Sequence, residues 1–455
     1  MRLNFTPLWG GLCLLFSAGT ASAQVPVNTF AASNNHSVSI RPDGSLWAWG
    51  INYEGQLGNG TTECSALPVR VTTEAPGTQW AQVAVGSSHT LALTTDGRLY
   101  AWGSNTDGQL GDGTKTPHHR PAVVRLPPSA AGARWKQIAA GTSHSLALAT
   151  DGRLFAWGNN NHGELGNGFS IDRATPVEVA LPHSAANTSW AQVVAGNNHT
   201  LALTNDGRLY AWGSNDYGQL GDGSGMTSLV PVPVGMTKKL AGLRWAQVAA
   251  GSFHTLAVTT NGRLYAWGSN RFGQLAGDRE VKQSTPAPLQ LAPALANVVW
   301  QQVAAGEAHS LALSADGRLL AWGNNCTGQL GDGTTDLRLK PITIAAPENA
   351  GAWARIESGA FHALATTTTG QFYAWGANKY GQLGDGTTTD QYRPLGQDPI
   401  LTTAAPASDQ TGPGYSKRAA FSTEEWGLND DRLLKELPES SSFWIQSPPA
   451  SESPR

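Results

Sequence analysis

The chain has 455 residues, of which 53 are glycine, 26 are proline and 17 are tryptophan, and only 14% are charged. Such a composition is typical of a turn-rich globular protein with enough apolar surface for a large core, and it excludes a long coiled coil or wholesale disorder. Thirty basic and 33 acidic residues give a formal net charge of −3. No broad electrostatic field therefore favours nucleic acid or an anionic membrane as a partner.

The first 23 residues have the order of a secretory signal peptide. Arg2 precedes an apolar stretch from Leu8 to Gly19, and Ala21-Ser22-Ala23 forms an A-x-A cleavage site before Gln24. The apolar stretch is shorter than the ~18 residues that a membrane-spanning helix needs. We therefore expect residues 1–23 to be removed, no membrane insertion after cleavage, and a mature protein that is secreted or periplasmic.

Residues 24–400 contain one unit repeated seven times. The tripeptide Ala-Trp-Gly recurs every 53 to 55 residues, and a histidine stands 13 residues before each of its tryptophans. Six of the units also open with a tryptophan nine residues before the histidine. The repeated histidines are His36, His89, His144, His199, His254, His309 and His362, and the tryptophans are Trp49, Trp102, Trp157, Trp212, Trp267, Trp322 and Trp375.

Each unit predicts four short strands, because apolar and small or polar residues alternate between turn signals. In the second unit Asp96-Gly97 predicts a two-residue hairpin in which both residues adopt a positive φ. A proline near the start of the last strand suits an outer edge strand. The four expected strands of this unit are Trp80–Val85, His89–Thr94, Arg98–Trp102 and Pro121–Leu126.

Four antiparallel strands repeated seven times predict an all-β fold, a seven-bladed β-propeller. The small residues at the end of the first strand place that strand innermost, at the central axis. The ring must close by bringing the first and last units side by side, because bare sheet edges invite aggregation. Cys64 and Cys326 fall in the first and sixth units, which are not neighbours, so we expect both to be unpaired.

The repeated unit resembles that of the regulator of chromosome condensation family over about residues 27–400. The resemblance rests on Gly-x-x-His-[Thr/Ser]-Leu-Ala, Asp-Gly-Arg-Leu and Trp-Gly-x-Asn-x-x-Gly-Gln-Leu-Gly. It implies a seven-bladed propeller used as a recognition scaffold. The founding nuclear member of the family is a guanine nucleotide exchange factor for a small GTPase, and a secreted relative inhibits β-lactamases.

Two departures from those relatives bear on function. The regular spacing leaves no room for the extra wedge that the nuclear exchange factor carries within a blade, and the signal peptide points away from a cytosolic GTPase. The inhibitor's repeats are shorter and lack the Gln-Leu-Gly-Asp-Gly-Thr continuation found here. Neither activity is carried over as the first expectation.

The repeated histidines and tryptophans are expected to be structural. One histidine per blade cannot converge on the ~2 Å bonds of a zinc site. We expect each to be buried and to donate a hydrogen bond to the backbone of a neighbouring blade, with the tryptophans packed between sheets. Neither a metal nor a cofactor is expected.

Glu357 is the clearest break in the repeat, because other blades carry alanine at that place. With Arg355 two residues before it, Glu357 is a candidate group of the central channel. No histidine or serine couples to this pair by spacing, so the sequence does not favour an enzyme.

The sequence therefore predicts a secreted, non-enzymatic, monomeric scaffold that recognises a protein partner not identified by the sequence. The alternatives are a guanine nucleotide exchange factor, a cell-envelope or carbohydrate-binding module, and an enzyme inhibitor. Beyond residue 400 the repeat ends, and residues 401–455 form a Pro/Ser-rich tail. A capping-box pattern at Ser422–Glu425 predicts a short helix near 423–437 within that tail.

Partner specificity is expected to come from the face that differs between blades. The hairpin turns and the links from each outer strand to the next inner strand share one face, whereas the loops of the opposite face are nearly identical in all units. Variable loops on a rigid scaffold supply distinct contacts, so the first face is predicted to bind. The candidate contact residues are His118, His119, Arg120, Lys238, Lys239 and Arg279.

Overall fold

The computed structural model describes residues 29–75, 77–235, 242–277 and 282–397. The chain divides into a unit of residues 1–409 and a second unit of residues 410–455, and all described residues belong to the first. The predicted signal peptide and tail helix, and the candidates Lys238, Lys239 and Arg279, lie outside the described residues.

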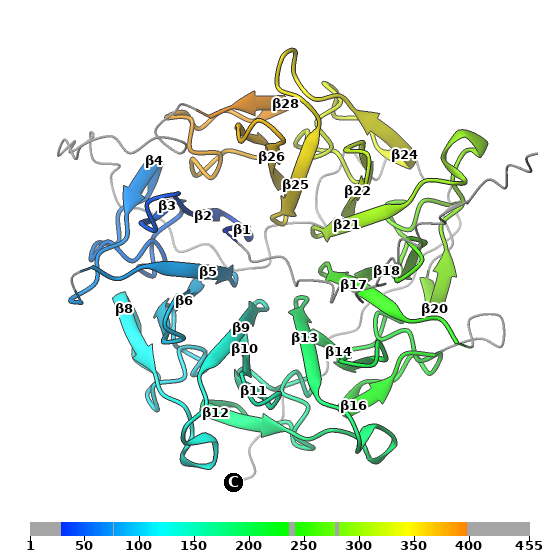
Figure 1. Ribbon diagram of the computed structural model, residues 1–455. Coiled ribbons are helices and arrows are strands. Elements are labelled where there is room, and N and C mark those ends of the chain that lie inside the picture. The colour runs from blue at the N-terminus through cyan, green and yellow to red at the C-terminus, as the bar shows by residue number, and fades with distance from the viewer. Residues whose placement is uncertain (1–28, 76, 236–241, 278–281, 398–455) are drawn as a thin grey trace, which may run out of the picture. The chain divides into compact units, whose positions relative to one another are not determined.

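The described residues form seven four-stranded antiparallel sheets, each built from consecutive strands, arranged as blades around a central axis (Figure 1). This confirms the predicted seven-bladed propeller and its all-β class. The strand that opens with tryptophan is innermost in blades 2 to 7, as predicted. The inner strands are β1 (Phe30–Ala32), β5 (Trp80–Val85), β9 (Trp135–Ala140), β13 (Trp190–Ala195), β17 (Trp245–Ala250), β21 (Trp300–Ala305) and β25 (Trp353–Ser358).

The other strands follow in the same order in every blade. The second strands are β2 (His36–Ile40), β6 (His89–Thr94), β10 (His144–Ala149), β14 (His199–Thr204), β18 (His254–Thr259), β22 (His309–Ser314) and β26 (His362–Thr367). The third are β3 (Leu46–Gly50), β7 (Leu99–Gly103), β11 (Leu154–Gly158), β15 (Leu209–Gly213), β19 (Leu264–Ser269), β23 (Leu319–Gly323) and β27 (Phe372–Gly376). The outer ones are β4 (Ser65–Arg70), β8 (His118–Val124), β12 (Arg173–Val179), β16 (Ser228–Pro233), β20 (Lys282–Pro288), β24 (Arg338–Ile344) and β28 (Gln391–Gly396).

Short 3₁₀ turns lie in three of the links between blades: η1 (Pro128–Ala130), η2 (His183–Ala185) and η4 (Pro293–Leu295). Within the described ranges, none of the helical segments has the length and apolarity needed to cross a bilayer.

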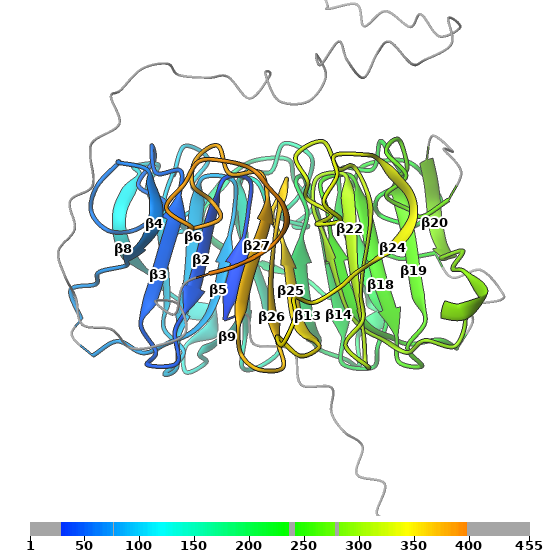
Figure 2. The same ribbon diagram turned by 90° about the horizontal axis from the view of Figure 1, so that it is seen from above.

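The antiparallel order gives the ring two different faces, seen edge-on in Figure 2. We call the mouth face the one that carries the loops from first to second strand and the connections from third to fourth strand. The hairpin face carries the turns from second to third strand and the links from each outer strand to the next inner strand.

The hairpin turns differ from the prediction. Gly97 has a φ of +80°, but Asp96 is not among the residues with positive φ. The Thr94 N–H donates to the Arg98 carbonyl at 2.9 Å and the Gly97 N–H donates to the Thr94 carbonyl at 3.0 Å. The loop therefore spans three residues and ends in a left-handed glycine, which is the second commonest hairpin geometry rather than the two-residue turn.

The cores lie between blades, where one blade's sheet packs on the next. One such core joins Leu46 and Leu57 of blade 1 to Trp80 and Trp102 of blade 2. The tryptophan of Ala-Trp-Gly is fully buried in all seven blades. Because every blade needs two neighbours to cover its faces, the ring is the unit that folds.

The ring closes by packing blade 7 on blade 1, as predicted. The Trp49 Nε1 of blade 1 donates to the Gln382 carbonyl of blade 7 at 2.8 Å. Phe30 of β1 meets Phe372 of β27 edge to face, with ring centroids 5.4 Å apart.

Candidate functional site

Six of the seven repeated histidines join neighbouring blades through a hydroxyl. In blade 2, His89 Nε2 lies 2.9 Å from Ser145 Oγ of blade 3. That hydroxyl donates to the Gln109 carbonyl of blade 2 at 2.8 Å, and Trp157 Nε1 donates to the same carbonyl at 2.9 Å. Because the hydroxyl has one proton and gives it to the carbonyl, the histidine must donate from Nε2. The prediction of a direct bond to backbone is therefore wrong: a side-chain hydroxyl stands between them.

The contact recurs around the ring with two exceptions. In blade 7 the hydroxyl position holds Ala363, and Ser358 of β25 supplies the Oγ that lies 2.9 Å from His309 Nε2. The imidazole of His199 has no hydrogen-bond partner among the described residues. The remaining partners are Thr90 for His36, Thr200 for His144, Ser310 for His254 and Ser37 for His362.

The histidines are neutral at physiological pH. Burial lowers the pKa of His144 from 6.5 to about 3, and the other repeated histidines shift in the same direction for the same reason. Among the residues that the structure describes, no three His, Cys, Asp or Glu side chains form a set that could hold a metal ion. The repeated histidines therefore serve contacts between blades.

Glutamines of the inner strands form a second set of contacts between blades. Gln247 Oε1 accepts the Val303 N–H at 2.8 Å, and Gln247 Nε2 donates to the Val303 carbonyl at 3.3 Å. Gln302 binds Ile356 of blade 7 in the same way, at 3.1 and 2.6 Å. Gln247 and Gln302 therefore each bind the inner strand of the next blade through both the donor and the acceptor of the side-chain amide.

Arg355 stands at the glutamine position in blade 7, where the ring closes. Its Nη1 donates to Thr29 Oγ1 of blade 1 at 3.2 Å, and its guanidinium carbon lies 5.0 Å from the ring centre of Phe30. Glu357 Oε1 lies 3.8 Å from Arg355 Nη2. Burial raises the pKa of Glu357 to about 7.

This placement changes the interpretation of the pair. Residues two apart on a strand share a face, and Arg355 contacts blade 1, so both side chains lie at the junction of blades 7 and 1. Glu357 does not belong to the lining of the cavity at the channel mouth. The pair therefore lies at the closure of the ring, and the channel role of Glu357 stays a prediction.

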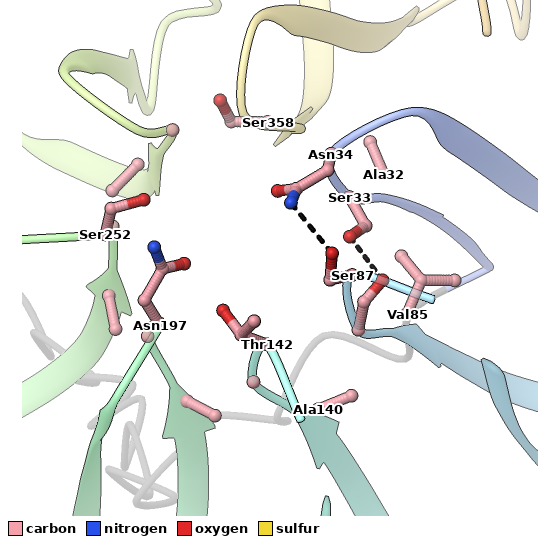
Figure 3. Close-up of a pocket in the computed structure, with 18 residues that line it drawn as sticks. Ala32, Ser33, Asn34, Val85, Ser87, Ala140, Thr142, Asn197, Ser252 and Ser358 are labelled. Carbon is pink, nitrogen blue, oxygen red and sulfur yellow. Dashed lines mark hydrogen bonds between the residues drawn. The ribbon is translucent and has the colours of Figure 1, made fainter. Parts of the chain in front are cut away.

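The loops between first and second strands surround the channel on the mouth face (Figure 3). They enclose a cavity of about 110 Å³ lined by hydroxyl and amide groups, among them Asn34, Ser87, Thr142, Asn197 and Ser252. Asn34 Nδ2 donates to Ser87 Oγ at 2.9 Å, one of the contacts drawn in Figure 3. A pocket of this volume has room for a few waters or one inserted side chain, whereas small-molecule sites usually measure ~300–1,000 Å³.

Glycine is required in these loops because neighbouring backbones touch. A Cβ on Gly196 would lie 2.5 Å from the Gly251 carbonyl oxygen and 2.2 Å from His199 Cε1. The Ser87 N–H donates to the Thr142 carbonyl of the next blade at 3.1 Å. The loops therefore form a continuous annulus around the mouth.

The candidate contact residues His118, His119 and Arg120 lie in the first half of the outer strand β8, and not in a loop of the hairpin face. His118 Nε2 lies 2.7 Å from Asp112 Oδ2. His119 packs against Gly55 of blade 1, and Arg120 bonds Thr72 of the same blade. The segments predicted to form one variable face begin in the third-to-fourth connections, so they start on the mouth face.

The mouth face also varies more than predicted, because two positions of each loop motif are free to change. Tyr217 is 42% exposed, and its ring centre lies 5.0 Å from that of Phe253 on the adjoining blade. Tyr53 is 60% exposed at the position that corresponds to Asp216. These residues stand at the x positions of Asn-x-x-Gly and Gly-x-x-His, which is the signal that could have identified them.

The closed ring and its repeated contacts match known proteins. The chain matches the family model of the RCC1-like domain over residues 171–431 and the Regulator of chromosome condensation (RCC1) repeat over residues 43–93 and 96–148. The chain belongs to the RCC1-like family. This RCC1-like propeller is 33% identical over 413 residues to the Ultraviolet-B receptor UVR8 of Arabidopsis thaliana. The aligned residues cover 88% of this chain and 90% of the receptor.

One further relative matches this chain over a small part of its own length, and two solved structures share the fold. The E3 ubiquitin-protein ligase HERC2 of Homo sapiens is 32% identical over 73% of this RCC1-like chain, which spans only 7% of that ligase. The crystal structure of Prp20p from Saccharomyces cerevisiae, described with its binding to Gsp1p and histones, has a TM-score of 0.67 at 26% identity and covers 81% of this chain and 87% of Prp20p. Human WBSCR16 has a TM-score of 0.68 at 26% identity, covering 77% and 93% of the two chains.

Proposed function

We propose that this RCC1-like propeller is a scaffold for protein–protein recognition that acts outside the cytoplasm and catalyses no reaction. One observation carries the proposal. The residues that repeat in every blade are buried in contacts between blades, whereas the residues that differ between blades lie at the surface. A rigid ring with variable surface positions is suited to recognising an asymmetric partner.

The relatives support the same general role. Prp20p is described with its binding to Gsp1p and histones, and a further structure shows Kap60 bound to it. The small volume of the mouth cavity is also more suited to an inserted side chain than to a metabolite.

The experiment is capture with the mature chain, residues 24–455, immobilised and exposed to the native extracellular or periplasmic fraction. We expect one protein to be enriched saturably and to bind again when both are purified, with an unrelated seven-bladed propeller as the control. Absence of any saturable protein ligand, together with saturable binding to a glycan or envelope polysaccharide, would contradict the proposal and favour the carbohydrate-binding alternative.

The similarity to Prp20p keeps the exchange-factor alternative as a second candidate. If the captured partner is a small GTPase, release of a fluorescent guanine nucleotide from it should be measured with and without this chain. Acceleration that depends on the chain's concentration would replace the scaffold with an exchange factor.

The extracytoplasmic location rests on the order of residues 1–23 and is tested separately. The N-terminus of the protein purified from its native host should be Gln24. A mature protein that retains Met1 in the cytoplasm would contradict this part of the proposal.

A further inference from the structure

Five large apolar side chains are exposed at the outer rim where blades 3 and 4 meet. They are Phe169 (57% exposed), Ile171 (61%), Met226 (71%), Leu229 (36%) and Val230 (49%), and we call them the rim patch. Phe169 and Ile171 precede β12, and the other three precede or begin β16, the neighbouring outer strand in Figure 1.

Backbone contacts join the two halves of the rim patch. The Gly168 N–H donates to the Leu229 carbonyl at 2.9 Å, which ties the loop of blade 3 to the outer strand of blade 4. A Cβ on Gly168 would lie 3.9 Å from Val230 Cγ1. The residue before Phe169 therefore lies directly beside Leu229 and Val230 of the next blade.

Asparagines hold the patch in a defined geometry. Asn160 Nδ2 donates to the carbonyls of Phe169 and Ile171 at 2.8 and 3.2 Å, and Asn215 Nδ2 donates to the carbonyl of Met226 at 3.1 Å. The side chains thus project from backbone that is fixed, which lowers the conformational entropy lost when a partner binds.

Three of the five positions, those of Phe169, Ile171 and Met226, are polar at their described counterparts in blades 1, 2, 6 and 7. The other two are not confined to this rim, because Leu67 of blade 1 stands beside Gly386 as Val230 stands beside Gly168. Equivalent hydrogen bonds identify Thr114 as the counterpart of Phe169, and Thr116 as the counterpart of Ile171 and Met226. Thr175 stands beside Gly113 as Val230 stands beside Gly168. The framework therefore does not need apolar side chains at the positions of Phe169, Ile171 and Met226, and a cluster of exposed apolar side chains usually marks an interaction site.

A carboxylate borders the patch. Asp222 Oδ1 accepts the Ser224 N–H at 3.0 Å, and Ser224 Oγ accepts the Met226 N–H at 3.1 Å, so two hydrogen bonds join the carboxylate to the patch. Asp222 is also bound by the Asn215 amide at 3.0 Å, and no ion pair joins it to a cation among the described residues. On the other side Asp172 is already paired with Lys115 at 3.4 Å. At the edge near Met226, Lys282 Nζ of blade 5 donates to the Asp216 carbonyl at 3.2 Å and forms no ion pair with Asp222. The chemistry left open is therefore apolar, with the Asp222 carboxylate joined to the patch by hydrogen bonds.

We propose that the rim patch docks a protein segment that presents adjacent apolar side chains and a lysine or arginine placed to meet Asp222. The proposal rests on the proposed recognition function and adds where the partner binds and what chemistry it carries. The outer strand of blade 4 contains Pro231 and Pro233, which lack N–H donors, so the segment binds through side chains rather than by adding a strand to the sheet.

The test uses variants whose new residues come from other blades of the same chain. The rim variant replaces Phe169, Ile171, Met226 and Val230 by threonine, the residue at the equivalent positions, so the fold is retained. The control variant replaces three exposed apolar residues of other outer strands by threonine: Leu67 (54% exposed), Val123 (49%) and Tyr392 (45%).

The probe is a phage-displayed library of random peptides, panned against the mature wild-type chain, followed by fluorescence anisotropy with the enriched peptides. We expect these peptides to combine aliphatic or aromatic residues with lysine or arginine. Their Kd should rise about tenfold or more for the rim variant and less than about twofold for the control variant. Asp222→Asn should weaken binding and reduce its dependence on salt.

Equal binding to the rim variant and the wild type, or enrichment of no peptide, would overturn the proposal. The proposal would also be overturned if analytical ultracentrifugation showed a dimer for the wild type and a monomer for the rim variant, because the patch would then bind a second copy of the chain. If the partner captured from the native fraction binds the rim variant as tightly as wild type, the recognition function stands and the rim proposal fails. If no protein partner exists, the recognition function fails whatever the peptides do.

Discussion

The buried histidines predict that acid will unfold this propeller at an unusually mild pH. Each repeated histidine has a pKa of 6.5 when unfolded, and about 3 in the folded ring, or about 4 for His199. Below pH 6.5 the unfolded chain binds protons that the folded ring cannot, so stability falls as pH falls. Lowering the pH from 7.5 to 5.5 costs about 1.4 kcal/mol for each histidine and about 9.5 kcal/mol for all seven.

Two carboxyl groups act in the opposite direction. Burial raises the pKa of Glu307 and of Glu357 from 4.5 to about 7. As the pH falls, the folded state therefore binds these two protons before the unfolded chain does, and this binding stabilises the folded state. Over the same interval the two groups restore about 3.5 kcal/mol. The expected net loss in the free energy of unfolding is about 6 kcal/mol, comparable to the whole stability of many domains.

Denaturant unfolding of the mature chain at several pH values between 5.5 and 7.5 measures this loss. Replacing His144 by glutamine removes one titrating group, so it should reduce the slope of stability against pH by about 1.2 kcal/mol per pH unit at pH 5.5. A free energy of unfolding that stays constant within about 2 kcal/mol over the interval would refute the reasoning.

Four further outcomes are expected. Gly196→Ala places a Cβ 2.5 Å from the Gly251 carbonyl and should destabilise the ring by about 1–3 kcal/mol in denaturant, whereas Gly277→Ala, with nothing within 4 Å, should change stability by less than about 0.5 kcal/mol. Trp267→Phe removes the donor to the Gln219 carbonyl and leaves a gap, so calorimetry should show a loss of about 1–3 kcal/mol; an unchanged Tm would contradict that contact. Glu357→Ala alone should lower the Tm because Arg355 keeps its buried charge, but Arg355→Gln combined with Glu357→Ala should restore it or exceed it, since glutamine stands there in other blades. Removal of residues 24–40 deletes β1 and β2 and should abolish cooperative unfolding; a truncated chain that kept the wild-type Tm would show that blade 1 is dispensable.

The sequence was sufficient to predict the propeller. A period of 53 to 55 residues with strand alternation inside it is compatible with few architectures. A single unit cannot bury its apolar faces by itself, so the units must pack against one another. The same repeats identified the inner strand, the outer strand and the closure of blade 7 on blade 1. The hairpin geometry was missed because Asp-Gly fits both a two-residue turn and a three-residue turn, and only the strand register distinguishes them.

The functional surface was harder to predict for a related reason. Repeated residues such as His89 are easily recognised in sequence, but they serve contacts between blades. The sequence also placed His118 to Arg120 on the hairpin face, because it did not show where the third-to-fourth connection ends and strand β8 begins.

The sequence by itself determined the number of blades, the order of strands and the residues common to all blades, since these follow from local alternation and a fixed period. Only the tertiary structure decided which residues meet across blades: Ser358 beside His309, Arg355 beside Thr29, and the loop of Phe169 beside the strand of Val230. These pairs are separated by many residues along the chain, and their contact depends on the rotation of one blade relative to the next. Local sequence patterns carry no information about that rotation, which is set by side-chain packing between sheets.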